Sequence, residues 1–169
     1  ATYTEAEQIA AKVTVTGLQG TDALTSIKLN GQKTDAGEYP ETIVPSEAAI
    51  GNATDNYEIA YVSGTLTITK AKMTVTAENY IGVYDGQAHT VTATASVTEG
   101  TTIEYSTDNE TWSETAPTWT DVTEAQTVYV KAENPNYETA TDDGTVTITP
   151  KEVTITVANA EKVYGAGDP

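Results

Sequence analysis

The sequence predicts an all-β chain made of antiparallel two-sheet sandwiches arranged end to end. The segment NYEIAYVSGTLTIT from Asn56 to Thr69 returns as NYETATDDGTVTIT from Asn136 to Thr149, which is 80 residues later (136 − 56). Such a fixed period is typical of arrays of repeated modules. Thr accounts for 34 of the 169 residues and alternates with small or branched apolar residues, which is the period-two pattern of half-buried strands.

The strand pattern is clearest from Ala88 to Val97, where Val91, Ala93 and Ala95 fall on one face and the intervening Thr residues on the other. Other strands are expected to direct pairs of apolar residues toward a core. These pairs are Val13 and Val15, Ile27 and Leu29, Leu66 and Ile68, Met73 and Val75, Val128 and Val130, Val146 and Ile148, and Val153 and Ile155.

Turn residues separate these strands. Asp143-Gly144 and, one period earlier, Ser63-Gly64 predict short hairpins, with each glycine required by the backbone. Asn30-Gly31 and Asp108-Asn109 predict two further hairpins. The only helix-like stretch is Thr4 to Lys12, where Ala, Glu and Gln follow a Thr that could cap the first turn.

The 80-residue period divides the chain into three parts. Residues 1–70 form a first repeat that lacks its leading strand, residues 71–150 form a complete second repeat, and residues 151–169 open a third, truncated one. The joint Lys70-Ala71-Lys72 contains no flexible Gly/Ser linker. A joint this short predicts a stiff rod in which neighbouring repeats are each other's partners.

Charge and composition exclude several classes of function. Eight Lys and no Arg stand against 25 carboxylates, and the net charge of −17 repels phosphate backbones and anionic lipids. We therefore expect no nucleic-acid partner, and the lack of a long apolar run predicts no direct membrane insertion. The chain has no Cys, so disulfides, thiolate metal sites and thiol nucleophiles are all excluded.

Several motifs together resemble the MBG and YDG-type repeats of bacterial surface proteins. They are YDGQAHTVTA from Tyr84, NYE at Asn56 and Asn136, the endings GTLTITK and GTVTITP, and KVYGAGDP near the C-terminal end. The resemblance implies Ig-like β-sandwich modules in a tandem array of a large adhesin, located extracellularly at the cell surface. It implies no shared catalytic or ligand-binding site.

Residues with catalytic or metal-binding chemistry are few. The single His, His89, begins a strand and has no Cys or Arg as a helper, so we expect no enzyme activity. Calcium is the one candidate cofactor, because hard oxygen ligands are plentiful; the candidate ligands are Asp108, Asp142 and Asp143. The alternative interpretation is that these are solvated turn acids that keep the protein soluble.

Trp112 and Trp119 are the candidate ligand-binding residues, because aromatic faces stack on sugars and the first repeat has no Trp. The alternative is that they pack into the sandwich. The alternation of Lys131 with Val128 and Val130 places it on the opposite face, where we expect either a salt bridge or no ion pair, rather than an isopeptide bond.

Two functions remain open on the sequence. The first is a structural stalk or spacer that projects a distal domain of a surface protein. The alternative is an adhesin module that binds a host glycan or protein through the Trp112–Trp119 region. The strand-like segment Glu152 to Val157 also predicts strand pairing, either with the first repeat of a neighbouring copy or with the second repeat's own sheet.

Overall fold

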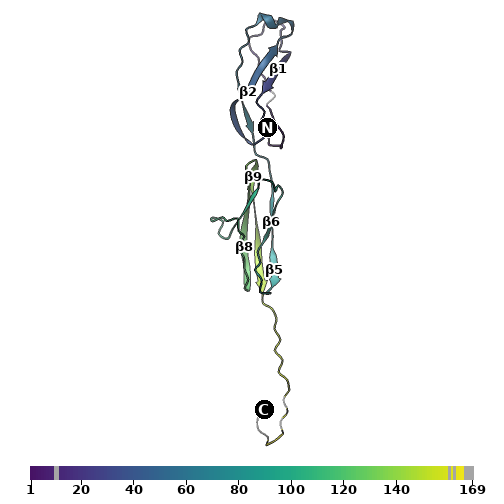
Figure 1. The fold of residues 1–169 in the computed structure, drawn as a ribbon, viewed down its shortest axis with the longest axis vertical. Coiled ribbons are helices and arrows are strands. Elements are labelled where there is room, and N and C mark those ends of the chain that lie inside the picture. Colours follow the sequence, from purple (N-terminus) through teal and green to yellow (C-terminus); the bar gives the residue numbers. More distant parts are fainter. Residues whose placement is uncertain (10–11, 160, 162, 166–169) are drawn as a thin grey trace.

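The protein is an elongated, almost entirely β molecule in the computed structural model, which describes residues 1–9, 12–159, 161 and 163–165 (Figure 1). Two groups of strands follow one another along the long axis, and an extended segment continues from the second. The first lobe comprises β1 (Ser26–Asn30), β2 (Gly37–Ala49), a 3-10 helix (Gly51–Asn56) and β3 (Gly64–Ile68). The second lobe comprises β4 (Val75–Glu78), β5 (Tyr80–Val83), β6 (Thr92–Ala95), β7 (Thr102–Ser106), β8 (Thr123–Asn134) and β9 (Tyr137–Thr149).

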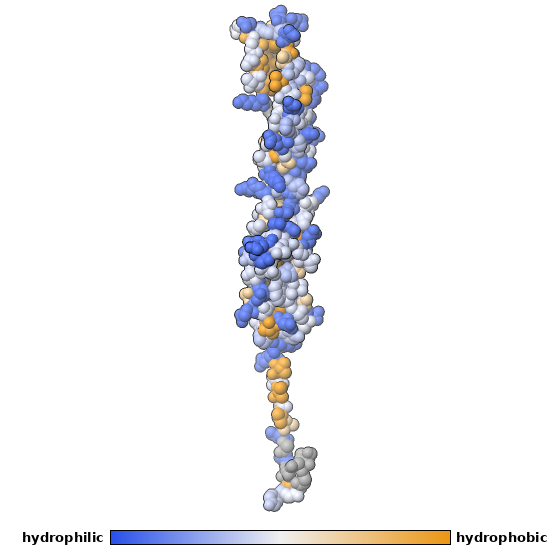
Figure 2. Space-filling model, turned by 90° about the vertical axis from the view of Figure 1, so that its left-hand side faces the viewer, coloured by the Kyte–Doolittle hydropathy of each residue, from blue (hydrophilic) through white to orange (hydrophobic). Residues whose placement is uncertain are grey.

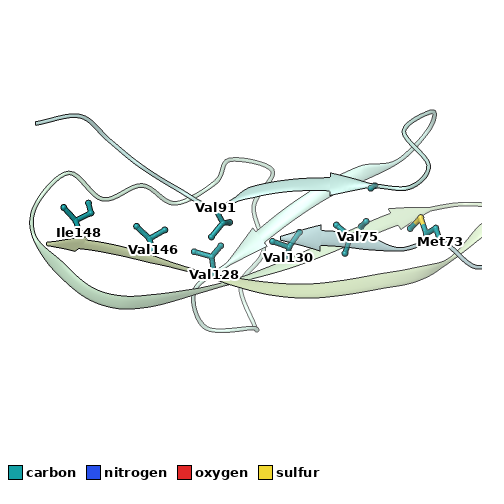
Figure 3. Packing of buried hydrophobic residues seen from close by; sticks show 9 residues of the cluster. Met73, Val75, Val91, Val128, Val130, Val146 and Ile148 are labelled. Carbon is teal, nitrogen blue, oxygen red and sulfur yellow. The ribbon is translucent and has the colours of Figure 1, made fainter. Parts of the chain in front are cut away.

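The second lobe is a two-layer sandwich. One layer is the antiparallel pair β4-β6, and the other is a four-stranded sheet in the order β5-β9-β8-β7, in which only the β5–β9 pairing is parallel. The buried core between the layers is aliphatic and draws residues from both sheets (Figure 3). Its members are Met73, Val75, Val91, Ala95, Val128, Val130, Ala132, Val146 and Ile148.

Period-two alternation explains why these strands form. On β8 the side chains of Val128, Val130 and Ala132 are fully buried, whereas Tyr129 and Lys131 between them are not. Burying each Val side chain contributes roughly 1.5–3 kcal/mol relative to leaving it exposed. The predicted all-β class is confirmed, and the apolar pairs expected on β3, β8 and β9 do face a core.

The first lobe contains one sheet, in the antiparallel order β1-β2-β3. Its buried cluster is small, consisting of Ile43, Leu66 and Ile68, with Tyr3, Leu29 and other side chains packed beside it. The strand order and pairing directions match those of β7-β8-β9. Two isolated β-bridges of the first lobe also have counterparts in the second lobe. Thr2 pairs with Thr69 in parallel as Val83 pairs with Thr149, and Gln8 pairs with Lys33 in antiparallel as His89 pairs with Trp119.

The first lobe lacks a counterpart of the β4-β6 layer among the described residues. Val13 and Val15 were expected in a core-facing strand, but they lie outside the strands, with 37% and 42% of their surface exposed. The physical reason is the missing partner. In the second lobe β6 pairs with β4, and no segment of the first lobe stands where β4 does.

Two other local predictions are wrong. The described part of Thr4–Lys12, residues 4–9 and 12, is not helical, because Gln8 pairs with Lys33 through two backbone hydrogen bonds; residues 10 and 11 lie outside the described residues. Asp143-Gly144 is not a turn but lies inside β9. Gly144 is buried, and a Cβ there would lie 3.0 Å from Val91 Cγ1, so the layers pack closely at this position.

Two predicted turns are confirmed. Asn30-Gly31 begins the loop between the antiparallel strands β1 and β2, and Gly31 has φ +108°. Asp108-Asn109 lies in a tight turn after β7, where Tyr105 pairs back with Ser113. The predicted hairpin at Ser63-Gly64 is wrong, because Gly64 is already the first residue of β3 and Ser63 lies outside any turn.

Candidate functional site

Trp119 is a packing residue of the second lobe. It is partly buried against the aliphatic core, and its backbone exchanges two 2.9 Å hydrogen bonds with His89. This position matches the packing interpretation of Trp119.

Trp112 lies elsewhere on the second lobe, in the segment after the Asp108 turn. The Lys131 ammonium sits 4.8 Å from the centre of its ring, a cation–π contact. Lys131 also forms ion pairs with Glu104 at 2.8 Å and Glu133 at 3.4 Å. The pKa of Lys131 is raised, mainly by its hydrogen bond to Glu104. Lys131 therefore forms a salt bridge, and its ammonium also contacts the face of the Trp112 ring.

Asp108 organises the turn after β7. Its Oδ1 accepts hydrogen bonds from the backbone N–H of Thr111 at 2.7 Å and of Glu110 at 2.8 Å, and from the hydroxyl of Ser106 at 2.8 Å. These donors, led by Thr111, hold the pKa of Asp108 far below its ordinary value. The carboxylate is engaged by the protein's own donors, as expected of a turn acid.

The Asp108 turn should make stability depend on acidic pH. Because the folded-state pKa of Asp108 lies below its unfolded value, its contribution is present above the unfolded pKa near 4 and is lost as pH falls through the folded value. We expect Asp108→Ala to lower the melting temperature at pH 7, with the difference from wild type shrinking below pH 4. Thermal unfolding at several pH values tests this, with Asp121→Ala as an exposed control; a constant difference across pH would contradict it.

Asp142 and Asp143 do not converge on one site. They are consecutive residues of β9, so their side chains leave opposite faces of the strand. Asp142 Oδ2 accepts a 2.8 Å hydrogen bond from the backbone N–H of Ala77 and so links the two layers, whereas Asp143 is exposed. In the described part of the chain, no three His, Asp or Glu side chains gather as metal ligands would.

We expect chelation to have little effect on stability. Excess EDTA should lower the melting temperature by only a few degrees, because Asp108 is occupied by backbone donors and Asp142 by Ala77. Differential scanning calorimetry with EDTA, and after adding back Ca²⁺, measures this. A drop of more than about 10 °C, which corresponds to about 2 kcal/mol for a lobe of this size, would reveal a metal site.

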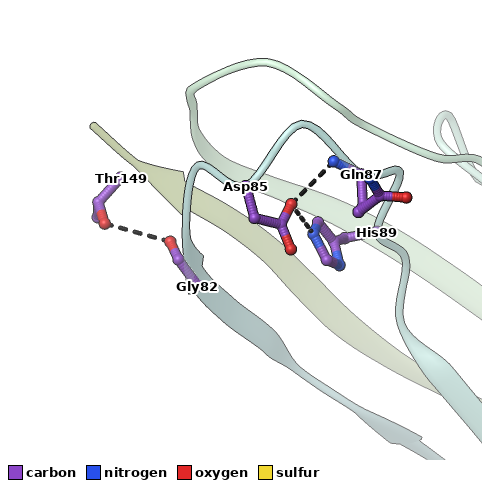
Figure 4. Close-up of polar contacts among 5 residues, drawn as sticks. All are labelled: Gly82, Asp85, Gln87, His89 and Thr149. Atoms are coloured by element: carbon purple, nitrogen blue, oxygen red, sulfur yellow. Dashed lines mark hydrogen bonds and ion pairs between the residues drawn. The ribbon is translucent and has the colours of Figure 1, made fainter. Parts of the chain in front are cut away.

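His89 forms a compact polar cluster near the start of the β6 segment (Figure 4). Its Nε2 lies 2.9 Å from Asp85 Oδ1, and its ring stacks on Tyr80 with centroids 4.0 Å apart. The contact with His89 and a 2.8 Å hydrogen bond from the Gln87 N–H lower the pKa of Asp85. These contacts join His89 to the Asp85 turn and to Tyr80 on β5.

The two lobes contact each other through a set of polar side-chain interactions. Asn136 Oδ1 accepts a 2.8 Å hydrogen bond from the Ala36 N–H, and Asn136 Nδ2 donates to Asp35 at 3.0 Å. Tyr137 donates its hydroxyl to Glu5 at 3.0 Å, and its ring meets Tyr3 edge-on at 5.3 Å.

Backbone hydrogen bonds also hold the connection between the lobes against the second lobe. Ala71, in the middle of the short connection, accepts a 2.8 Å hydrogen bond from the Glu138 N–H and donates one of 3.0 Å to Asn136 O. The NYE motif of the second repeat is thus the point where the second lobe contacts the first. The contact partner of Asn136, 100 residues away, could not be read from the sequence motif.

The equivalent motif in the first lobe lies at the far end of the molecule. Tyr57 Oη accepts a hydrogen bond from the Gln19 N–H at 3.0 Å and donates one to Asp22 at 2.7 Å. The hydrogen bond to the Asp22 carboxylate raises the pKa of Tyr57. The hydroxyl thus bonds the backbone of a distant segment, and the ring itself is partly covered.

The first lobe contains a groove that is lined by both apolar and polar residues. It has a volume of about 610 Å³, and Figure 2 shows apolar side chains gathered in a hollow at that end of the molecule. Its lining includes Val13, Val15, Leu24, Ile27, Ile50 and Ile59.

No helix among the described residues has the length and apolar character required to cross a membrane. Comparison with known proteins found no match among curated proteins and none among solved structures. One protein-family model does match, over residues 2–67, and it describes an MBG domain of the YGX type. That range includes the first-lobe sheet except its last residue, and it ends at the GTLTIT segment that also closes the second repeat. Residues 2–67 therefore form an MBG-type repeat.

Proposed function

We propose that the chain is a non-catalytic stalk segment of a bacterial cell-surface protein, which holds a distal functional domain away from the envelope. The MBG-type repeat supports a place in a surface protein. The extended arrangement of the two lobes supports a role as a spacer (Figure 1). The net charge of −17 favours a solvated rod that resists collapse onto itself or onto an anionic cell surface.

The observation that carries the proposal is the joint. A flexible tether would leave the lobes free to reorient. Here Asn136 and Tyr137 bind side chains and backbone of the first lobe, and the backbone of Ala71 in the connection is also hydrogen-bonded to the second lobe. Two of these contacts are charge-assisted hydrogen bonds, from Asn136 to Asp35 and from Tyr137 to Glu5, and the connection between the lobes is short. A spacer needs this property, because only a joint that resists bending keeps a distal domain at a distance.

The joint can be tested by small-angle X-ray scattering of dilute protein. We expect wild type to scatter as a rod and Asn136→Ala/Tyr137→Phe to show a broader distribution of maximum dimensions, because the side-chain contacts that restrain bending are gone. Asn56→Ala/Tyr57→Phe is the matched control, since it removes the same side-chain groups at the end away from the joint. A compact wild-type particle, or a joint variant as straight as wild type, would reject the spacer.

The location is tested separately. Antibodies against residues 71–149 should label intact cells of the source bacterium as strongly as permeabilised cells. Labelling only after permeabilisation would reject the surface location while leaving the stiffness of the joint unaffected.

A further inference from the structure

The first residues of the second lobe, 71–84, run parallel to β9 over its whole length. At the joint, Ala71 pairs in parallel with Tyr137. At the other end of the lobe, the parallel β5–β9 pairing finishes with Val83 opposite Thr149. The offset is 66 residues at both ends (137 − 71 and 149 − 83). The two segments therefore keep one register, although β4 between these ends belongs to the other layer.

Side chains hold this register in the middle of the lobe, where the segment crosses between the layers. Asp142 Oδ2 on β9 accepts a 2.8 Å hydrogen bond from the Ala77 N–H. Asn79 Oδ1 accepts one of 2.7 Å from the Thr145 N–H, again 66 residues away. The crossing lies close to Gly144, where an added Cβ would be 3.5 Å from Ala77 Cβ and 3.4 Å from Asn79 Oδ1. The segment is thus bonded to β9 in the middle as well as at both ends.

The end of the pairing away from the joint has two further bonds. The Tyr84 N–H donates a 2.9 Å hydrogen bond to the Thr149 carbonyl oxygen. The Thr149 hydroxyl donates one of 3.1 Å to the carbonyl oxygen of Gly82 (Figure 4). Successive bonds in a parallel pairing are evenly spaced, so a pull along the strands is shared among them.

The chain enters the second lobe at the joint and leaves it at the opposite end (Figure 1). Tension on the chain therefore pulls residues 71–84 toward the first lobe and pulls β9 away from it. Two parallel strands pulled in opposite directions along their length separate only when several hydrogen bonds break together. The same strands opened from one end lose their bonds one at a time.

We propose that residues 71–84 and β9 form a mechanical clamp, which lets the second lobe carry tension along the chain without unfolding. The inference rests on the proposed stalk function, because a stalk between a distal domain and the envelope is placed under tension whenever that domain is held. It adds to that function the requirement that the repeat resists force in the direction of the chain.

Single-molecule force spectroscopy in two pulling directions tests the clamp. The chain has no Cys, so thiol handles can be placed at chosen exposed residues of the full chain. Handles at Lys70→Cys and Lys151→Cys pull the clamp along its strands and leave the first lobe out of the load path. Handles at Gln87→Cys and Lys151→Cys open the same strands from the Tyr84–Thr149 end. We expect the unfolding force to be at least about twofold higher in the first direction, because the bonds then share the load.

A pair of variants tests the role of the middle of the clamp. Asp142→Ala removes the bond to Ala77, and we expect it to lower the force along the strands by roughly one fifth or more, because one of several shared bonds is lost. It should leave the opening force unchanged, since opening starts at the other end of the pairing. Asp143→Ala is the matched control, because Asp143 is the neighbouring residue of β9 and is exposed. It should change neither force.

Equal forces in the two pulling directions would overturn the clamp. So would equal losses with the two aspartate variants, or an Asp142→Ala variant that lowers both forces in the same proportion, as a general loss of stability does. The stalk is tested independently by scattering and by cell labelling. A direction-dependent force in a chain that fails those two tests would keep the clamp and reject the stalk.

Discussion

Replacing Ile148 by Ala is expected to destabilise the second lobe by about 3 kcal/mol, because it removes a large side chain that is only 1% exposed and leaves a cavity between the layers. For a lobe of this size the corresponding fall in melting temperature is about 12–24 °C. Both Trp residues lie in the second lobe, so the thermal transition of Trp fluorescence reports on this lobe alone.

Ile81→Ala is the matched control for this experiment. Ile81 lies on β5, which pairs with β9 beside Ile148, but 74% of its surface is exposed. The same chemical change there should shift the Trp transition by no more than a few degrees, in line with an exposed site. Similar shifts in the two variants would mean that the aliphatic core does not hold the lobe together.

Replacing Gly31 by Ala should destabilise the first lobe strongly while leaving the second intact. Gly31 has φ +108°, which an L side chain rarely adopts, and an added Cβ would collide with the backbone carbonyl oxygen of Thr42. Backbone strain alone costs about 1–3 kcal/mol. Because the buried cluster of this lobe has only three members, we expect a fall in its melting temperature of at least about 10 °C.

Circular dichroism, which follows both lobes, should show this loss, while the Trp fluorescence transition should stay close to that of wild type. Gly17→Ala separates strain from collision. Gly17 has φ +89° but no atom within 4 Å of an added Cβ, so it should cost only the conformational strain. An equal loss in both variants would show that the contact with Thr42 is unimportant.

The strand content was predictable because it depends on local alternation. Leu66, Ile68, Val128, Val130, Val146 and Ile148 alternate with polar residues, and each of them is buried. Turn chemistry was a weaker guide. Asn30-Gly31 and Asp108-Asn109 do bend the chain, but Asp143-Gly144 lies within β9, where Gly144 packs close to Val91. A glycine required by packing and a glycine required by a turn look alike in a sequence.

The candidate sites could be predicted only as far as residue types allow. Trp119 and Asp142 have the chemistry of ligand-binding and metal-binding residues, yet the fold uses the first for core packing and the second to join two layers. These uses depend on neighbours distant in sequence, such as Ala77, 65 residues from Asp142. The partners of Asn136 and Tyr137 across the joint are equally remote.

The sequence by itself determined the all-β class, the 80-residue repeat and the resemblance to MBG-type repeats, because alternation and periodicity are properties of neighbouring residues and of spacing. Only the tertiary structure decided which strands find partners. Val13 and Val15 have the same alternation as residues of β6, but strand formation also requires a second strand to satisfy backbone hydrogen bonds and cover the apolar face. In the second lobe β4 supplies it, and in the first lobe no described segment does, which leaves a groove where the other lobe has a core.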